Sequence, residues 1–201
     1  MGPRVIVAVP LAIASQIVYE PMLPVDRSFL HQRMPGGAIS KINIVYDEPF
    51  WRHDGLSGQS AAPGSPAPVT IDACTDAPRP GVMCVIVEGP VARQIASSTR
   101  RSEGERSWPN SSGVSATRPR RRWDYVEQCW TTERYSGGGM ISHAPPGVLT
   151  QFGHALRPPC GRIHWAGTES SAVMCGWVDG AVRSGERAAT EVMQPERVGV
   201  A

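Results

Sequence analysis

Lysine is nearly absent from this sequence, and the residue patterns of several common site types are missing. Lys41 is the one lysine among 20 basic residues. No physical task requires every other surface cation to be a guanidinium, so coding bias explains this better than function does. The five cysteines are odd in number and include no Cys-x-x-Cys pair. This indicates neither a zinc site nor a disulfide framework, and a reducing cytoplasm is the default location.

Other absences narrow the function further. No catalytic triad and no cluster of metal ligands is recognisable, so we expect no metal. The net charge of +2 gives no indication of a nucleic-acid or membrane partner. No Gly-x-Gly-x-x-Gly follows a strand, although that motif lets the backbone approach the pyrophosphate of a dinucleotide. The nearest candidate, Gly137–Gly139, is a plain glycine run after Ser136.

Long hydrophobic runs are also absent, apart from one near the N-terminus. Arg4 precedes VIVAVPLAIAS, which could be read as a signal peptide. Pro10 interrupts this run, and the polar residues Gln16 and Glu20 follow closely. We therefore favour a buried strand over Val5–Val9 that Pro10 ends, and we expect no membrane segment.

The most informative stretch that is present runs from Gly161 to Met193. It predicts a short buried strand (162–166), a Gly-Thr-Glu turn (167–169), a loop, and a helix from about Cys175. One face of the helix is apolar and small. Its members are Val178, Ala181, Val182, Gly185, Ala188, Ala189 and Val192. Small residues there suit a helix that lies very close to something, and a tight turn beside a helix N-terminus is typical of an anion or cofactor site.

The residues before this stretch predict further elements. Asp26 is a possible N-cap for a short helix through Gln32. Residues 38–46 alternate as a strand does, with Lys41 on the side opposite Ile42. Two more strands are expected over 69–74 and 81–89, after a loop over 54–68. On pattern alone Lys41 is a solvent-facing strand residue.

The middle of the chain, 91–122, differs in kind, because it holds eight arginines and many serines with almost no apolar periodicity. A nucleic-acid patch is one interpretation, but beyond Trp108 no aromatic residues are interleaved with the basic ones. A disordered linker fits the composition better. A third hypothesis is that this segment is translated from a shifted reading frame. Resequencing the gene would exclude this if an uninterrupted frame were confirmed.

Four blocks in this order resemble the flavin-containing amine oxidases, the monoamine oxidase family. They are KINIVYDEPFW from Lys41, WTTERYSGGG from Trp130, PPGVLTQFGHALRPP from Pro145, and AGTE followed by GWVDGAVRSGERAA within 166–189. Intact blocks on both sides of 91–122 are what motivate the frameshift hypothesis.

The resemblance implies an α/β (α+β) fold that is the C-terminal half of a two-domain FAD-linked enzyme. Residues 1–15 would be a strand and crossover from the FAD-binding domain. Residues 16–150 would be part of the substrate-binding domain with its mixed sheet, irregular over 91–122. Residues 151–201 would be the last, FAD-contacting strand, turn and helix. The half that carries the dinucleotide fingerprint would then be missing, or encoded separately.

The resemblance also implies a set of site residues. Lys41 matches a lysine thought to hold a water at the flavin N5 edge. Trp130 matches a tryptophan near the flavin. The turn Gly167, Thr168 and Glu169 would face the FAD, and the N–H groups of Trp177 and Val178 would point at the flavin pyrimidine edge.

Two positions flank the substrate in these enzymes and are usually both tyrosine. Met140 and Trp177 match them, so one ring face is replaced by a flexible apolar side chain. The residue that matches the covalent attachment cysteine of some members is Gly139, so the resemblance implies noncovalent FAD.

The implied reaction oxidises a primary amine or polyamine to an imine and then an aldehyde, with oxygen as the second substrate and hydrogen peroxide released. The cofactor supplies this chemistry, and the protein supplies position and field. The alternative is an inactive C-terminal fragment that cannot hold FAD without the dinucleotide-binding half.

Overall fold

The computed structural model describes residues 3–65, 67–77, 79–99 and 122–194. The chain divides into two compact units, one formed by 1–37 with 134–201 and one by 38–133. We name them the terminal unit and the sheet unit. These bounds differ from the three consecutive segments expected above, because the backbones around Gly37 and Gly139 bond to each other and join the two ends of the chain in one unit.

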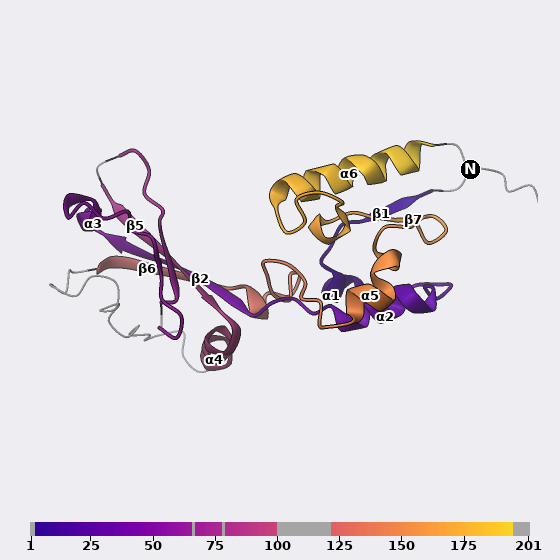
Figure 1. Cartoon of the computed structure of the whole chain (residues 1–201), viewed down its shortest axis with the longest axis horizontal. Helices are drawn as coiled ribbons and strands as arrows, with labels where there is room; N and C mark the ends of the chain where they lie inside the picture. Colours follow the sequence, from indigo (N-terminus) through magenta and orange to yellow (C-terminus); the bar gives the residue numbers. More distant parts are fainter. Residues whose placement is uncertain (1–2, 66, 78, 100–121, 195–201) are drawn as a thin grey trace, which may run out of the picture. The chain divides into compact units, whose positions relative to one another are not determined.

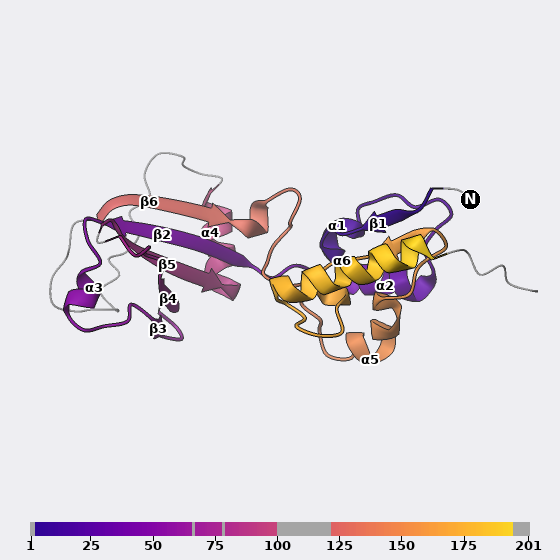
Figure 2. The ribbon, with the colours of Figure 1, turned by 90° about the horizontal axis from the view of Figure 1, so that it is seen from above.

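The sheet unit is built on five antiparallel strands in the order β3-β4-β5-β2-β6. The strands are β2 (Ile39–Tyr46), β3 (Ser60–Ala61), β4 (Val69–Asp72), β5 (Gly81–Glu88) and β6 (Arg122–Cys129). Figure 2 shows β6, β2 and β5 side by side. The strands expected over 38–46, 69–74 and 81–89 are thus confirmed.

The alternation expected in β2 is also confirmed. Ile42 and Ile44 are buried in the core of the sheet unit, whereas Lys41 is exposed on the other face. Trp51, in the short helix α3 (Phe50–His53), completes one end of this core. Its indole N–H donates to Asp72 Oδ2 at 2.9 Å.

The segment expected to be irregular begins as a helix. α4 (Gly89–Thr99) packs against β2 and β5, and Ala92 is fully buried. The expectation for 91–122 is therefore wrong up to Thr99, because apolar residues at 91, 92 and 95 suffice for one amphipathic face. The remaining stretch, 100–121, lies outside the described residues.

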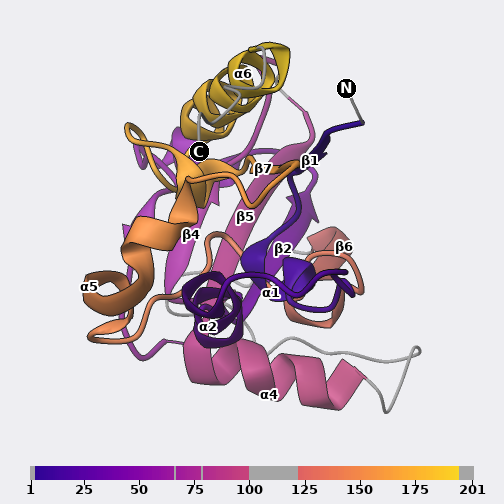
Figure 3. The same cartoon turned by 90° about the vertical axis from the view of Figure 1, so that its right-hand side faces the viewer.

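The terminal unit has three layers. The middle layer is a short parallel pair of strands, β1 (Val5–Val7) and β7 (Ile163–Trp165). Helix α6 (Val178–Met193) lies on one face of the pair, and α1 (Leu11–Ala14) and α2 (Val25–Arg33) lie on the other (Figures 1 and 3). The remaining elements of this unit are α5 (Val148–Phe152), η2 (Gly153–Leu156) and η3 (Thr168–Ser170), and η1 (Trp130–Thr132) belongs to the sheet unit.

The helices α1, α2 and α5 of this unit share a small apolar core. Leu30 from α2 and Met34, which directly follows α2, pack with Leu11 and Val148. The helix expected over 26–32 is confirmed, but Asp26 is not its N-cap. Pro24 occupies that position without a side-chain cap, and Asp26 falls in the first turn, where its negative charge suits the helix N-terminus.

The first strand is shorter and more exposed than expected. It ends at Val7, and Val5 and Ile6 are 55% and 40% exposed. The prediction of a buried strand over Val5–Val9 is therefore wrong for this chain, because β1 has one neighbouring strand among the described residues.

The last helix begins at Val178 rather than near Cys175, and of the expected apolar face only Ala188 is fully buried. Gly180, Ser184 and Ala188 are buried, whereas Val178 and Val182 are 82% and 55% exposed. The four-residue spacing of small side chains decides which face approaches β7, and apolarity alone does not.

Candidate functional site

The candidate site lies where β1 and β7 end. The two strands are parallel, so their carboxyl ends meet at one edge, where open α/β sheets bind ligands. The turn that follows β7, Gly167–Glu169, lies at this edge. Gly167 has φ +120°, a backbone conformation that favours glycine.

Several hydrogen bonds hold the turn against α6 and the loop before it. The Gly167 N–H donates to Ser184 Oγ at 2.9 Å. Thr168 Oγ1 donates to the Trp177 carbonyl at 3.0 Å and accepts from the Gly176 N–H at 2.7 Å. The turn and the start of α6 therefore form one rigid corner.

Gly180 explains why the helix needs small residues. A Cβ at this position would collide with the Met174 carbonyl oxygen and would lie 3.2 Å from Thr168 Oγ1. A Cβ at Gly185 would meet nothing within 4 Å. The expected close approach is confirmed at Gly180, whereas among the described residues nothing requires a glycine at 185.

The corner presents unused main-chain donors. Among the described residues, nothing accepts a hydrogen bond from the N–H groups of Thr168, Glu169 or Val178. Val178 is the first residue of a 16-residue helix, whose N-terminus favours negative charge. The N–H of Trp177 instead donates to the Met174 carbonyl at 3.1 Å, so the expectation that it points at a ligand is wrong.

A second connection brings the segment around Met140 to the corner. Glu169 Oε1 accepts from the Ser142 N–H at 3.0 Å. The Gly139 N–H donates to the Gly37 carbonyl at 2.9 Å, and added Cβ atoms at Gly36 and Gly37 would collide with the backbone of the glycine run.

Both predicted substrate residues, Met140 and Trp177, are exposed near this connection. Met140 and Trp177 are 69% and 67% exposed, and Ile141 Cδ1 lies 3.4 Å from the Cβ position of Gly176. Six of the predicted site residues thus lie in the terminal unit. They are Gly167, Thr168, Glu169, Trp177, Val178 and Met140.

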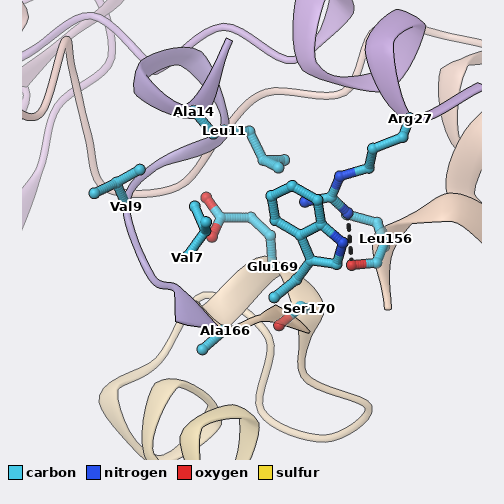
Figure 4. A pocket seen from close by; sticks show the side chains of 10 residues that line it. Val7, Val9, Leu11, Ala14, Arg27, Leu156, Ala166, Glu169 and Ser170 are labelled. Atoms are coloured by element: carbon cyan, nitrogen blue, oxygen red, sulfur yellow. Dashed lines mark hydrogen bonds between the residues drawn. The ribbon is translucent and has the colours of Figure 1, made fainter. Parts of the chain in front are cut away.

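A hollow under the corner has a polar floor. Arg27 and Glu169 reach it from different elements (Figure 4). The Arg27 guanidinium lies 3.6 Å from the Trp165 ring centroid and donates to the carbonyls of Ala155 and Leu156, each at 2.8 Å. Burial lowers the pKa of Arg27 to about 10.

His31 bonds to Arg27 as a neutral ring. Its Nε2 accepts from Arg27 Nε at 2.8 Å. Burial, and then the charge of Arg27, lower the pKa of His31 to about 4. The arrangement requires an acceptor nitrogen at Nε2, which the neutral imidazole provides.

The sequence analysis missed the side chains that hold the corner from behind. Arg157 donates to the carbonyls of Ser170 and Ser171, both at 3.0 Å. Arg187 donates to the Trp165 carbonyl at 2.7 Å and to Ser170 Oγ at 3.2 Å. The signal for Arg187 was its position four residues before Glu191, which bonds both Arg187 and His164.

Glu191 is ionised more readily than a free glutamate. Burial alone would raise its pKa, but the hydrogen bonds from His164 and Arg187 outweigh that effect and lower the pKa. His164 Nδ1 lies 2.9 Å from Glu191 Oε2, so a hydrogen bond joins strand β7 to the end of α6, beside the Arg187–Glu191 ion pair.

The other two predicted site residues belong to the sheet unit. Lys41 lies on the exposed face of β2, with Ile86 and Gln128 as its cross-strand partners. Trp130, at the start of η1, is 41% exposed. Within the described ranges, no group of three or more His, Cys, Asp or Glu side chains could hold a metal, and no helix has the length and apolarity to cross a membrane.

Comparison with known proteins defines the class. The model of the family of flavin-containing amine oxidoreductases matches residues 2–193. The chain therefore belongs to this family, as its four sequence blocks predicted.

Individual proteins are also similar to this chain over most of its length. An L-amino acid dehydrogenase of Synechocystis is 39% identical over 199 residues, which cover 96% of this chain and 41% of that protein. The flavin-containing amine oxidase B of Sus scrofa is 34% identical over 194 residues, which cover 94% of this chain and 37% of the relative.

Among solved structures, the cyclohexylamine oxidase of Brevibacterium oxydans matches with a TM-score of 0.81 at 27% identity, over 94% of this chain and 42% of that one. The mixed α/β fold is thus part of an amine oxidase structure. This chain spans about two fifths of the length of these proteins.

Proposed function

We propose that this chain contributes to a flavin-dependent amine oxidase that converts a primary amine or polyamine to an imine and then an aldehyde, with hydrogen peroxide as the second product. The observation that carries the proposal is the corner formed by the Gly167–Glu169 turn and the start of α6. Five of the predicted cofactor residues (Gly167, Thr168, Glu169, Trp177 and Val178) and the predicted substrate pair lie in the same unit.

The donor set of the corner fits FAD. The unused N–H groups of Thr168, Glu169 and Val178 suit a ligand rich in acceptor atoms that gains negative charge on reduction. Gly180 keeps Thr168 within reach of the helix N-terminus, where a larger residue would force them apart. Gly139 has no side chain to form a covalent link, so the proposed attachment is noncovalent.

Bound FAD would supply the redox chemistry. The Val178 N–H would donate to the flavin and hold it at the helix N-terminus, where the dipole favours negative charge. Trp177 and Met140 would pack on either side of the amine. Lys41 would order a water at the flavin edge, and Trp130 would pack nearby. The five free cysteines support a cytoplasmic location.

The alternative, an inactive fragment, is favoured by one specific observation. The sequence contains no Gly-x-Gly-x-x-Gly, and the chain covers 41% of the Synechocystis relative. A visible spectrum of the purified chain separates the two proposals. Flavin absorbance bands that co-purify with the chain support the oxidase, and a colourless chain that takes up no added FAD supports the fragment.

The role of Lys41 has its own test in a flavin-loaded preparation. Lys41→Met should slow flavin reoxidation by oxygen, whereas Asn43→Met, two residues along the same face of β2, should not. Equal reoxidation rates in the two variants would remove the proposed role of Lys41.

A further inference from the structure

Another hollow of the terminal unit lies between the end of α1 and one side of α2, and we name it the link hollow. It shares no lining residue with the hollow under the corner. Its lining includes Ile17 and Leu23 from the segment that links the two helices, and Ser28 and His31 from α2. Its volume is about 250 Å³, which suits a small organic molecule better than a single water.

His31 brings a polar atom to the inner wall of the link hollow, although the residue is only 3% exposed. Its Nε2 accepts from Arg27 Nε, and because a guanidinium can only donate, the proton of the neutral ring lies on Nδ1. Among the described residues nothing accepts from this N–H. Nδ1 is also not one of the fully enclosed polar atoms without a partner, so it is reached from the hollow that His31 lines.

Neighbouring rings hold this donor in a fixed orientation. The His31 ring lies 5.3 Å from the Trp165 ring at an interplanar angle of 84°, and 6.4 Å from the Tyr19 ring. Tyr19 is itself fixed, since its hydroxyl donates to the Ala14 carbonyl at 3.0 Å. The donor and the aromatic part of the wall are therefore formed before any ligand arrives.

The lining offers no charge to a ligand. Among the described residues it includes no Asp, Glu, Lys or Arg, and burial and the charge of Arg27 lower the pKa of His31 to about 4, so the ring is neutral at pH 7. The hydroxyls of Ser15 and Ser28 already donate to main-chain carbonyls. A charged ligand would lose its hydration here without a partner of opposite charge.

We infer that the link hollow binds a small uncharged molecule with an apolar body and a carbonyl oxygen, which accepts from the His31 Nδ1–H. The body would contact Ile17, Tyr19 and Leu23. Met22, which also lines the hollow and is 86% exposed, has a flexible thioether that adapts to ligands of different shape. The inference goes beyond the proposed function, because no lining residue belongs to the predicted FAD or amine sites.

The test titrates acetophenone, an aromatic ketone, into the purified full chain without added FAD and follows the methionine methyl groups by NMR. We expect roughly millimolar binding for a ligand of this size. The Met22 methyl should shift. Met193 is the matched control, because it is 83% exposed but lies at the end of α6, and its methyl should not shift. Equal shifts of the two methyls, or no shift of Met22, would overturn the inference.

A second probe tests the need for an uncharged acceptor. In 1-phenylethylamine an ammonium replaces the carbonyl on the same carbon skeleton, and we expect it to bind at least about tenfold more weakly at pH 7. Equal affinity of the two probes would contradict the role of the N–H. The imidazole nitrogen spectrum should show the His31 proton on Nδ1 and a shift of Nδ1 with the ketone, and a proton on Nε2 would contradict the assignment.

Two variants test the site itself. His31→Phe keeps an aromatic ring beside Trp165 but removes the N–H, and it should weaken ketone binding by about three- to tenfold. Since this change also removes the acceptor of Arg27 Nε, Ser28→Leu serves as a second variant that leaves that bond in place and fills the hollow from α2. It should abolish the Met22 shift. Unchanged ketone affinity in Ser28→Leu, or in folded His31→Phe, would overturn the inference.

Discussion

Replacing Gly180 by alanine should loosen the corner that the proposed function depends on. In an exposed helix interior, alanine in place of glycine gains up to about 1 kcal/mol. At Gly180 the new methyl would collide with the Met174 carbonyl oxygen, a backbone atom, and overpacking of this kind costs about 1–3 kcal/mol. We therefore expect Gly180→Ala to be neutral or to destabilise the chain by up to about 2 kcal/mol.

Gly185→Ala is the matched control, since it lies in the same helix with nothing within 4 Å of its Cβ position. It should stabilise the chain by up to about 1 kcal/mol. The assay is urea unfolding followed by circular dichroism, in which the two midpoints should move in opposite directions or differ by at least about 1 kcal/mol in free energy. Equal stabilisation by both variants would refute the close packing of Thr168, Met174 and α6.

Three further predictions concern the groups around the corner. Glu191→Gln should destabilise the chain at pH 7, because Glu191 loses its charge-assisted bonds to His164 and Arg187. The folded pKa of Glu191 is lowered, so the difference from wild type should shrink as the pH falls below about 4.3 and on through the folded pKa, and a difference that does not change at all on acidification would contradict this. The pKa of His31 is about 4 in the fold against 6.5 otherwise, so the unfolded chain binds more protons between these values and stability should fall as the pH drops from 6.5 to 4, a slope that His31→Gln should flatten in pH-dependent unfolding. Arg27→Met leaves two main-chain carbonyls without their donor and should cost about 1–3 kcal/mol in thermal unfolding, and a cost near zero would mean that water replaces the guanidinium.

The sheet unit was the part most open to prediction from the sequence. The alternation in β2 and the apolar runs of β4 and β5 follow from burial of one or both faces, and both signals are local. The helical start of 91–122 was missed because its amphipathic face is short and ends where arginine and serine become dense.

The terminal unit shows where local patterns fail. The buried face of α6 is set by Gly180, Ser184 and Ala188, because only small side chains fit against the turn. Apolarity pointed to Val178 and Val182, which face outward.

At the site, sequence blocks located the turn and the helix start but not the bonds that join them. Thr168 could be named from its motif. Its role in tying the Gly176 N–H and the Trp177 carbonyl together depends on a loop with no regular periodicity. For the same reason the bond from the Trp177 N–H to Met174 was not foreseen.

The most direct test of the central claim is the affinity for FAD of the chain, alone and with the unmatched part of the Synechocystis relative, measured by flavin fluorescence. Val178→Pro removes one free donor while proline at the first helical position preserves α6. We predict that wild type binds FAD in at least one of the two settings and that Val178→Pro binds at least about tenfold more weakly, with unchanged circular dichroism. Equal affinity of the two proteins, or no FAD binding by wild type in either setting, would contradict the account.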